Sequence, residues 1–268
     1  MELGTSDKDI MVCSTGTIGV QLPMDKIEAA IPKLAASLSP FGGDSASRAI
    51  LTTDTVPKQE AIEFYVGNKV VRIGGMCKGA GMISPDMATM LCFITTDAAV
   101  KQPDLQLALR TAVNKSFNRI TVDGDQSTND TVLVLANGMA GNSPLCHKSP
   151  DWSVFVSALE KICFDLAIKI VKDGEGATKF VTVRVNGAAS RSDALKAARS
   201  VAESLLVKTS WFGADPNWGR IIAAIGYAGI KMNEAKVDIS FDGIKAVEGG
   251  QSLSVSYTHL TLPTIYSV

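Results

Sequence analysis

The segment KGAGMISPDMATMLCFITTD, from Lys78 to Asp97, contains residues whose types and spacing suggest chemistry at the Ala88-Thr89 bond. An internal threonine hydroxyl is a weak nucleophile, but cleavage of the preceding peptide bond would create an α-amine that acts as a general base beside Oγ. Such an amine has an ordinary pKa of roughly 7.7 to 8.0, so part of it is neutral near pH 7. For an isolated Ala-Thr pair, a glycine-rich turn before a buried strand is the favoured alternative.

Other catalytic arrangements lack the residues they need. The chain has two histidines, and since His259 lies in an unusual C-terminal stretch, a Ser-His-Asp or Cys-His arrangement depends on the loop residue His147. No two histidines or cysteines stand at metal-ligand spacing, so we expect no metal site. The acidic segment DGDQSTND, residues 123–130, lacks the glycine and glutamate that a calcium loop requires, and we interpret it as a hydrogen-bonded acidic turn.

Composition limits the class of protein. The 268 residues are 46% hydrophobic, which is enough for a substantial core in one or two domains. A net charge of -1 without a basic block argues against a nucleic-acid partner. Five scattered cysteines indicate a reducing compartment. The sequence shows neither the long apolar run of a membrane protein nor the basic leader of a secreted one. We therefore predict a cytoplasmic chain.

Hydrophobic periodicity predicts a mixture of helices and strands. A Gly67-Asn68 turn indicates a hairpin over 63–73. The other expected strands are 88–95, 131–138, 179–187 and 236–243. The expected helices are 25–39, 103–118, 152–172 and about 194–205. Pro32 predicts a kink or break in the first of these helices. Because these elements follow no strict βαβ rhythm, we predict an α/β layered sandwich and not a Rossmann fold. Residues 255–268 carry no charged side chain and are interpreted as a non-native tail.

Six ordered segments carry a family resemblance. The chain resembles the ornithine acetyltransferases, also called bifunctional glutamate N-acetyltransferases, which are self-processing enzymes of arginine biosynthesis. The resemblance spans about Met11 to Leu253, through the segments STGTIG (14–19), TTDTVPK (52–58), KGAGMISPDMATMLCFITTDA (78–98), VDGDQSTNDTVLVLANG (122–138), KDGEGATKFVTV (172–183) and GADPNWGRI (213–221). It implies the layered α/β fold of the self-processing aminopeptidase type.

The resemblance also implies catalytic roles. Thr89 matches the residue that cuts the Ala88-Thr89 bond and then accepts the acetyl group on Oγ. Thr15 and Gly16 match the pair that forms the oxyanion hole, where loss of one donor typically costs about 3 to 4 kcal/mol. A plain turn is the structural alternative for Thr15 and Gly16.

Thr52, Lys78 and Glu175, together with Thr89, match substrate-binding positions. A lysine and a glutamate suit ligands that carry a carboxylate and an ammonium group. A strand edge, a solvated charge and a common loop residue are the respective alternatives for Thr52, Lys78 and Glu175.

The resemblance divides the chain into an alpha-chain portion, 1–88, and a beta-chain portion, 89–254, each shorter than in the family. It implies N-acetylornithine and glutamate as substrates, acetyl-CoA as a further donor if the enzyme is bifunctional, no cofactor, and a heterotetramer of two alpha and two beta chains. The chain departs from the family at Asp86, which replaces Asn near the cleavage point, and lacks a C-terminal Asn and Thr or Ser that contact substrate. An N-terminal-threonine aminopeptidase or amidase, and an inactive truncated chain, are the alternative functions.

Overall fold

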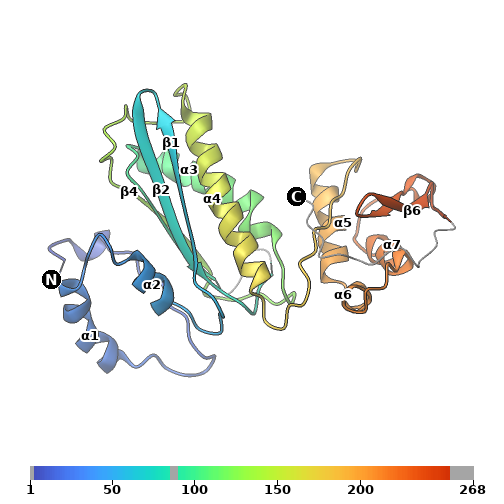
Figure 1. The fold of residues 1–268 in the computed structure, drawn as a ribbon, viewed down its shortest axis with the longest axis horizontal. Helices are drawn as coiled ribbons and strands as arrows, with labels where there is room; N and C mark the ends of the chain where they lie inside the picture. Colours follow the sequence, from blue (N-terminus) through green and yellow to red (C-terminus); the bar gives the residue numbers. More distant parts are fainter. Residues whose placement is uncertain (1–2, 85–89, 254–268) are drawn as a thin grey trace. The chain divides into compact units, whose positions relative to one another are not determined.

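The computed structural model describes residues 3–84 and 90–253, which belong to two compact units, Met1–Glu175 and Gly176–Val268 (Figure 1). The predicted tail, 255–268, and the predicted cleavage residues Ala88 and Thr89 lie outside the described residues. No helix in the described part of the chain is long and apolar enough to span a membrane.

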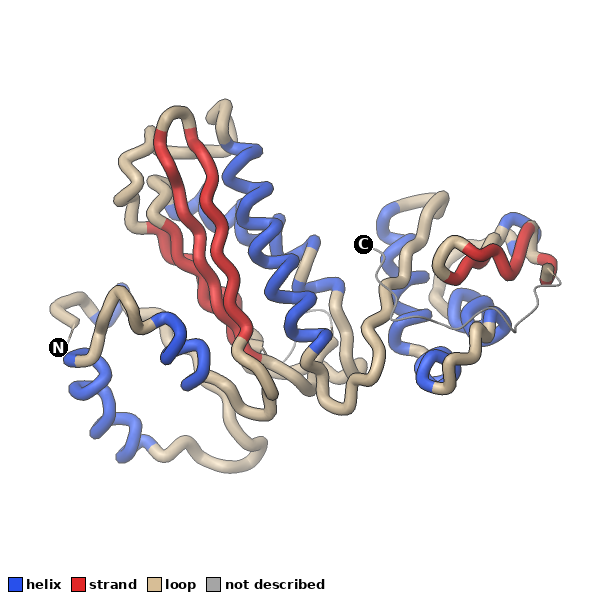
Figure 2. The backbone as a smooth tube through the Cα atoms, in the orientation of Figure 1, coloured by secondary structure: helices blue, strands red, loops and turns tan. Residues whose placement is uncertain are grey.

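The first unit is built on a four-stranded sheet, drawn in red in Figure 2. The strand order is β1-β2-β3-β4, with two antiparallel pairs followed by one parallel pair. The strands are β1 (Lys58–Val66), β2 (Lys69–Lys78), β3 (Leu91–Thr96) and β4 (Thr131–Ala136). The predicted hairpin is confirmed, and Gly67 at φ 58° supplies the left-handed residue that its turn needs.

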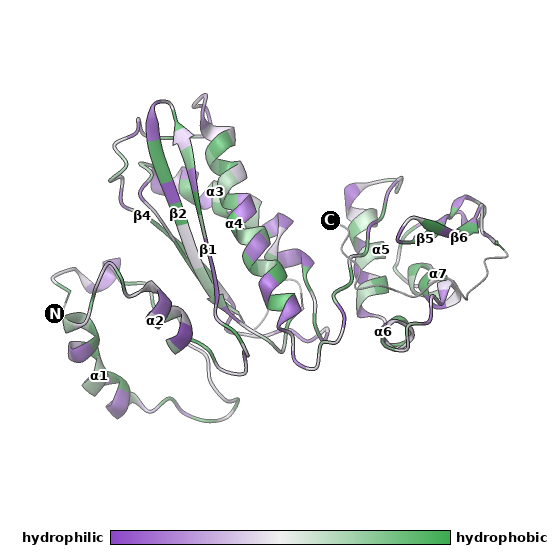
Figure 3. Cartoon of the chain, in the orientation of Figure 1, coloured by the Kyte–Doolittle hydropathy of each residue, from purple (hydrophilic) through white to green (hydrophobic). Residues whose placement is uncertain are grey.

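Two helices, α3 (Gln102–Lys115) and α4 (Trp152–Lys172), form a layer on this sheet, and both were predicted. α4 packs against α3, β1 and β2 through the apolar stripe visible in Figure 3. Gly75 permits this close approach, because a Cβ at that position would lie 3.0 Å from Leu166 Cδ1 and 3.3 Å from Ile162 Cγ2. A helical layer on a mixed sheet confirms the layered α/β prediction.

The first part of the chain contains η1 (Asp7–Asp9), α1 (Met24–Ala36) and α2 (Gly43–Ala49). The predicted helix over 25–39 is present but ends at Ala36. It continues through Pro32, so the break is absent, and the kink that was the other alternative stays a prediction. A proline inside a helix lacks a backbone N–H, so one hydrogen bond of the helix is missing there, and the bonds of the neighbouring residues still hold the helix together. η2 (Phe117–Arg119) follows α3.

The second unit contains α5 (Arg191–Glu203), α6 (Leu205–Phe212), α7 (Trp218–Gly226), η3 (Glu234–Lys236) and a three-stranded sheet of β5 (Ile239–Phe241), β6 (Ile244–Glu248) and β7 (Gln251–Ser252). The predicted helix over about 194–205 stops at Glu203, because Ser204 caps α6 by accepting from Val207 N.

The predicted strand over 179–187 is wrong, because in the described part of the chain this segment has no ladder partner. Alternating apolar side chains define two faces, but a strand also requires a neighbour for its backbone groups.

The division into two compact units differs from the predicted alpha and beta portions. Both predicted portions contribute strands to the first unit, with β1 and β2 from 1–88 and β3 and β4 from 89–254. A backbone cut before β3 would therefore produce two chains that both contribute strands to the same sheet. The division at Ala88-Thr89 itself stays a prediction.

Candidate active site

Three strand ends meet beside the predicted cleavage point. Lys78, at the end of β2, pairs with Leu91 at the start of β3, and Leu91 pairs with Thr131 at the start of β4. Met90, which directly follows Thr89 in the sequence, donates its N–H to Asp130 Oδ1 at 2.8 Å and accepts from Thr131 N at 3.1 Å. The residue after the predicted cleavage point is therefore fixed on both sides.

The acidic turn over 123–130 also holds the segment that precedes residues 85–89. Its last residue, Asp130, binds Met90, and its first residue, Asp123, binds the backbone before residue 85. Asp123 accepts from Met82 N at 2.6 Å and from Ile83 N at 2.9 Å, while Val122 N donates to Ile83 O at 2.7 Å. Met82 has φ 54°, a conformation that costs a non-glycine residue energy and that this set of hydrogen bonds maintains. The sequence indicated an acidic turn here, but not that its ends hold both flanks of residues 85–89.

Lys78 is a buried cation at this end of the sheet. It is 2% exposed, and among the described residues no hydrogen bond or ion pair reaches its Nζ. Burial lowers the pKa of Lys78, whereas the more distant Asp54 and Asp130 oppose that shift and Lys58 adds to it. Burial of an ammonium group is costly, and an anionic ligand bound at this end of the sheet would offset that cost. The alternative of a solvated lysine is therefore wrong.

Asp130 is a second titratable group in the same place. Burial raises its pKa to about 7, against the opposing effects of the Met90 N–H and the Lys78 charge. Its Oδ2 is buried and has no hydrogen-bond partner in the described part of the chain. This carboxyl group can therefore exchange a proton near neutral pH.

Thr52 and Glu175 converge on the segment that follows Lys78. Thr52 N donates to Asp54 Oδ2 at 3.3 Å, and Gly79 N donates to Asp54 Oδ1 at 2.7 Å. Asp54 thus joins the Thr52 loop to the end of β2. The Thr52 residue itself is exposed beside that junction.

Glu175 is tied to the next two residues of the same segment. Its N–H donates to Ala80 O at 2.8 Å. Its carboxylate lies over Gly81, because a Cβ on that glycine would meet the three carboxyl atoms at 2.8 to 2.9 Å. The structure therefore brings all three predicted substrate-binding residues other than Thr89 to residues 78–81, which the sequence alone does not reveal.

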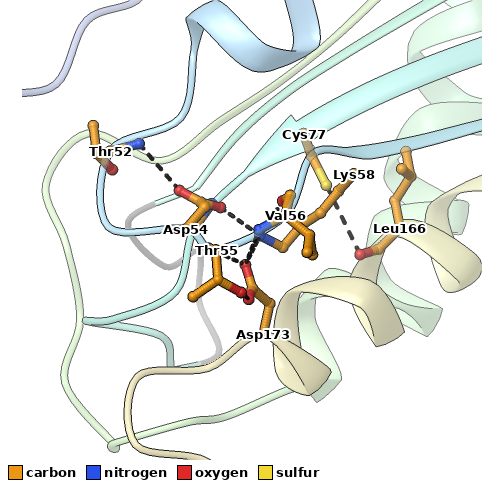
Figure 4. Close-up of polar contacts among 9 residues, drawn as sticks. Thr52, Asp54, Thr55, Val56, Lys58, Cys77, Leu166 and Asp173 are labelled. Atoms are coloured by element: carbon orange, nitrogen blue, oxygen red, sulfur yellow. Dashed lines mark hydrogen bonds and ion pairs between the residues drawn. The ribbon is translucent and has the colours of Figure 1, made fainter. Parts of the chain in front are cut away.

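A buried ion cluster supports this arrangement (Figure 4). Lys58 Nζ lies 2.5 Å from both Asp54 Oδ1 and Asp173 Oδ2, and the Lys58 side chain is 0% exposed. Asp173, at the end of α4, also accepts from Thr55 N at 3.0 Å and from Thr55 Oγ1. Burial raises the pKa of Asp54, but the hydrogen bonds from Gly79 and Lys58 outweigh it and hold the pKa below its ordinary value. Sequence reasoning missed this cluster.

The predicted oxyanion pair lies on a separate segment. Thr15 is half-buried and Gly16 is exposed, immediately before a turn at 18–19. Asn129 Nδ2 donates to Ser14 O at 3.0 Å, which attaches this segment to the residue before Asp130. The position of the pair relative to Thr89 stays a prediction, because Thr89 lies outside the described residues.

His147 does not form a catalytic triad within the described residues. Its Nδ1 and its backbone N–H both lie 2.9 Å from Asp104 Oδ1, and its side chain is 55% exposed. No serine or cysteine is hydrogen-bonded to the imidazole in the part of the chain that the structure describes. The same residues contain no group of three or more His, Cys, Asp or Glu side chains that could hold a metal ion.

Comparison with known proteins gives a consistent result. A family model described as "ArgJ family" matches residues 1–262. The chain is 52% identical over 252 residues to "Arginine biosynthesis bifunctional protein ArgJ" of Symbiobacterium thermophilum, and the match covers 94% of this chain and 63% of the relative. It is 51% identical over 248 residues to the protein of the same name from Geobacter sulfurreducens, covering 92% of this chain and 63% of the relative. The chain thus spans less than two thirds of the length of these relatives.

A solved structure is also similar. The crystal structure of "Arginine biosynthesis bifunctional protein argJ" from Bacillus halodurans matches with a TM-score of 0.62 and 47% sequence identity. The match covers 63% of this chain and 79% of that one. At this identity the likeness extends to sequence as well as to fold.

Proposed function

Because this chain belongs to the ArgJ family, we propose that it is a glutamate N-acetyltransferase of arginine biosynthesis that acts in the cytoplasm. It transfers the acetyl group of N-acetylornithine to glutamate through an acetyl ester of Thr89, after cutting itself at Ala88-Thr89. The observation that carries the proposal is the burial of Lys78, whose ammonium has no hydrogen bond or ion pair to any other described residue. Lys78 pairs across the sheet with Leu91, which follows Met90. A buried cation at this end of the sheet suits substrates with an α-carboxylate.

Self-cleavage begins with attack of Thr89 Oγ on the Ala88 carbonyl carbon. The peptide C–N bond breaks, the Thr89 nitrogen gains the hydroxyl proton, and an ester joins the two portions. Water then hydrolyses the ester, which frees the Ala88 carboxylate and the Thr89 α-amine. Asp123 and Asp130 support this step by holding the backbone on either side of residues 85–89.

Acetyl transfer then uses the free amine as general base. Thr89 Oγ attacks the acetyl carbonyl of N-acetylornithine, and the α-nitrogen of ornithine leaves with a proton. The α-amine of glutamate then attacks the acetyl-threonine ester, the ester C–O bond breaks, and Thr89 Oγ takes up the proton that the amine loses. Thr15 and Gly16 donate hydrogen bonds to the tetrahedral oxyanion. Lys78 binds the α-carboxylate that donor and acceptor share, and Glu175 binds the ornithine side-chain ammonium, with Thr52 beside them.

We propose two further features, of which the first is consistent with the word "bifunctional" in the names of the relatives and the second rests on the family resemblance alone. Acetyl-CoA would serve as a second acetyl donor, and the processed portions would assemble as two alpha and two beta chains. Neither reaction in this scheme needs a metal or prosthetic group.

Denaturing electrophoresis with intact-mass analysis tests the proposal. The wild-type chain should give two pieces cut before Thr89, and Thr89→Ala should give one. Thr95→Ala, which alters an exposed threonine on β3, is the matched control and should still give two pieces. Incubation with N-acetylornithine and glutamate should then yield N-acetylglutamate. One uncut wild-type species would refute self-processing, and release of free acetate in place of acetylglutamate would indicate an amidase.

A further inference from the structure

The Asp54 carboxylate uses both oxygens to organise the loop around Lys78. Oδ1 accepts from Lys58 Nζ at 2.5 Å and from Gly79 N at 2.7 Å, while Oδ2 accepts from Thr52 N at 3.3 Å. The Asp54 side chain is 0% exposed, so water cannot replace these donors. One carboxylate therefore fixes the backbone at Thr52 and at the residue after Lys78.

The charges around Lys58 do not balance. Lys58 is a single cation between Asp54 and Asp173, whose side chains are 0% and 7% exposed. When both carboxylates are ionised, the cluster carries one excess negative charge. Buried negative charge needs a nearby cation, and the buried cation that Asp54 attracts beyond this cluster is Lys78.

We propose that Asp54, held in place by Lys58, is a positioning residue of the substrate site, which fixes the segment carrying Lys78 through its bond to Gly79 N and supplies negative charge near the Lys78 ammonium group. This inference rests on the proposed role of Lys78 in binding the substrate carboxylate. Asp54 touches neither substrate nor the reacting atoms in this scheme, and it acts through Lys78, Gly79 and Thr52.

The groups that act on Lys78 define the test. Asp54 and Asp130 raise the pKa of Lys78, while its burial and the Lys58 charge lower it. Removal of the Asp54 charge should therefore lower this pKa further, so that the ammonium loses its proton at a lower pH. Asp173 binds the same Lys58 but is not among the groups that shift Lys78, which makes Asp173→Asn the matched control.

Nuclear magnetic resonance of chain labelled at lysine Cε and Nζ can follow the Lys78 titration directly, with the resonance assigned by its loss in Lys78→Arg. Asp54→Asn should lower the Lys78 midpoint by about one pH unit. Asp173→Asn should lower it by less than about a third of that shift. Asp54→Asn leaves Lys58 paired one-to-one with Asp173, so the charge balance changes at Lys78 and not at Lys58.

Asp54→Glu provides a second variant, because it keeps the charge. It should titrate within about 0.3 unit of the wild type. An unchanged midpoint in Asp54→Asn, or equal shifts in Asp54→Asn and Asp173→Asn, would overturn the inference. A shift in Asp54→Glu as large as that in Asp54→Asn would also overturn it, since any distortion of the loop would then suffice.

Calorimetric titration with N-acetylornithine separates this inference from the proposed function. If the wild type binds this ligand, the alkaline loss of affinity should move to lower pH in Asp54→Asn by the same amount as the Lys78 midpoint. If the wild type does not bind it, the proposed function loses support, while the resonance titration still decides whether Asp54 sets the state of Lys78.

Discussion

Replacement of Asp130 by asparagine should stabilise the chain at pH 8 and leave its stability at pH 4 almost unchanged. Burial raises the folded-state pKa of Asp130 to about 7, whereas an unfolded aspartate has a pKa of about 3.9. Because the folded pKa is the higher one, the wild type loses stability as pH rises between these values and does not recover above pH 7. Asparagine cannot ionise, and its Oδ1 can still accept from Met90 N, as Asp130 does at 2.8 Å.

The size of the effect follows from the shift. A difference of about three pKa units corresponds to an upper limit of about 4 kcal/mol. Asp130 is only partly buried, so solvent screening reduces the expected gain to about 1 to 2 kcal/mol at pH 8. Urea unfolding at pH 4, 6 and 8 measures it, with all variants in a Thr89→Ala background so that every chain has the same uncut backbone.

Asp125→Asn is the control, because Asp125 is an exposed residue of the same acidic turn. It should change the free energy of unfolding by less than about 0.5 kcal/mol at each pH. If Asp130→Asn gained as much at pH 4 as at pH 8, the gain would not come from ionisation. A loss of stability at pH 8 would mean that the charged carboxylate is better satisfied than its surroundings indicate.

Three other substitutions test the packing around the site and in the second unit. Gly81→Ala should raise the KM for N-acetylornithine about tenfold, since its Cβ would lie 2.8 to 2.9 Å from the Glu175 carboxyl atoms; an unchanged KM in initial-rate assays would contradict that contact. Gly75→Val should reduce the free energy of unfolding in urea by about 1 to 3 kcal/mol through overlap with Leu166, and a neutral result would contradict the close helix approach. Ser190→Ala should weaken hydrogen-exchange protection of α5 by about 1 kcal/mol through loss of its cap, whereas unchanged protection would mean that tertiary contacts hold the helix.

Local patterns predicted much of the fold. The helix over 152–172 agrees with α4 at both ends, and the Gly67-Asn68 turn indicated the hairpin correctly. Both depend on interactions between residues close in the sequence. The segment 179–187 has an equally clear alternation, yet it is not a strand in the structure. The alternation sets which way side chains point, and it carries no information about whether a neighbouring strand exists.

The site shows the same limit. Resemblance to a family indicated Thr52, Lys78 and Glu175, but not the contacts that bring them together. The bond from Lys58 to Asp173 joins residues 115 positions apart, so no local spacing could indicate it. Asp130 belonged to a segment whose acidic composition was evident, but its raised pKa depends on burial against elements that are distant in sequence.

Carboxylates perform one task repeatedly at this end of the sheet. Irregular loops leave backbone N–H groups without ladder partners, and buried donors of this kind need acceptors. Asp54 accepts from two such groups, Asp123 accepts from three and Asp130 accepts from one. This arrangement orders the loops but gathers negative charge at the place where the proposed function requires an anionic substrate to bind. In the proposed function Lys78 then has two roles, as counter-charge for the carboxylates and as the group that binds the substrate carboxylate. Protonation of Asp130 below about pH 7 removes one competitor for that ammonium, so an anion should gain affinity there as pH falls.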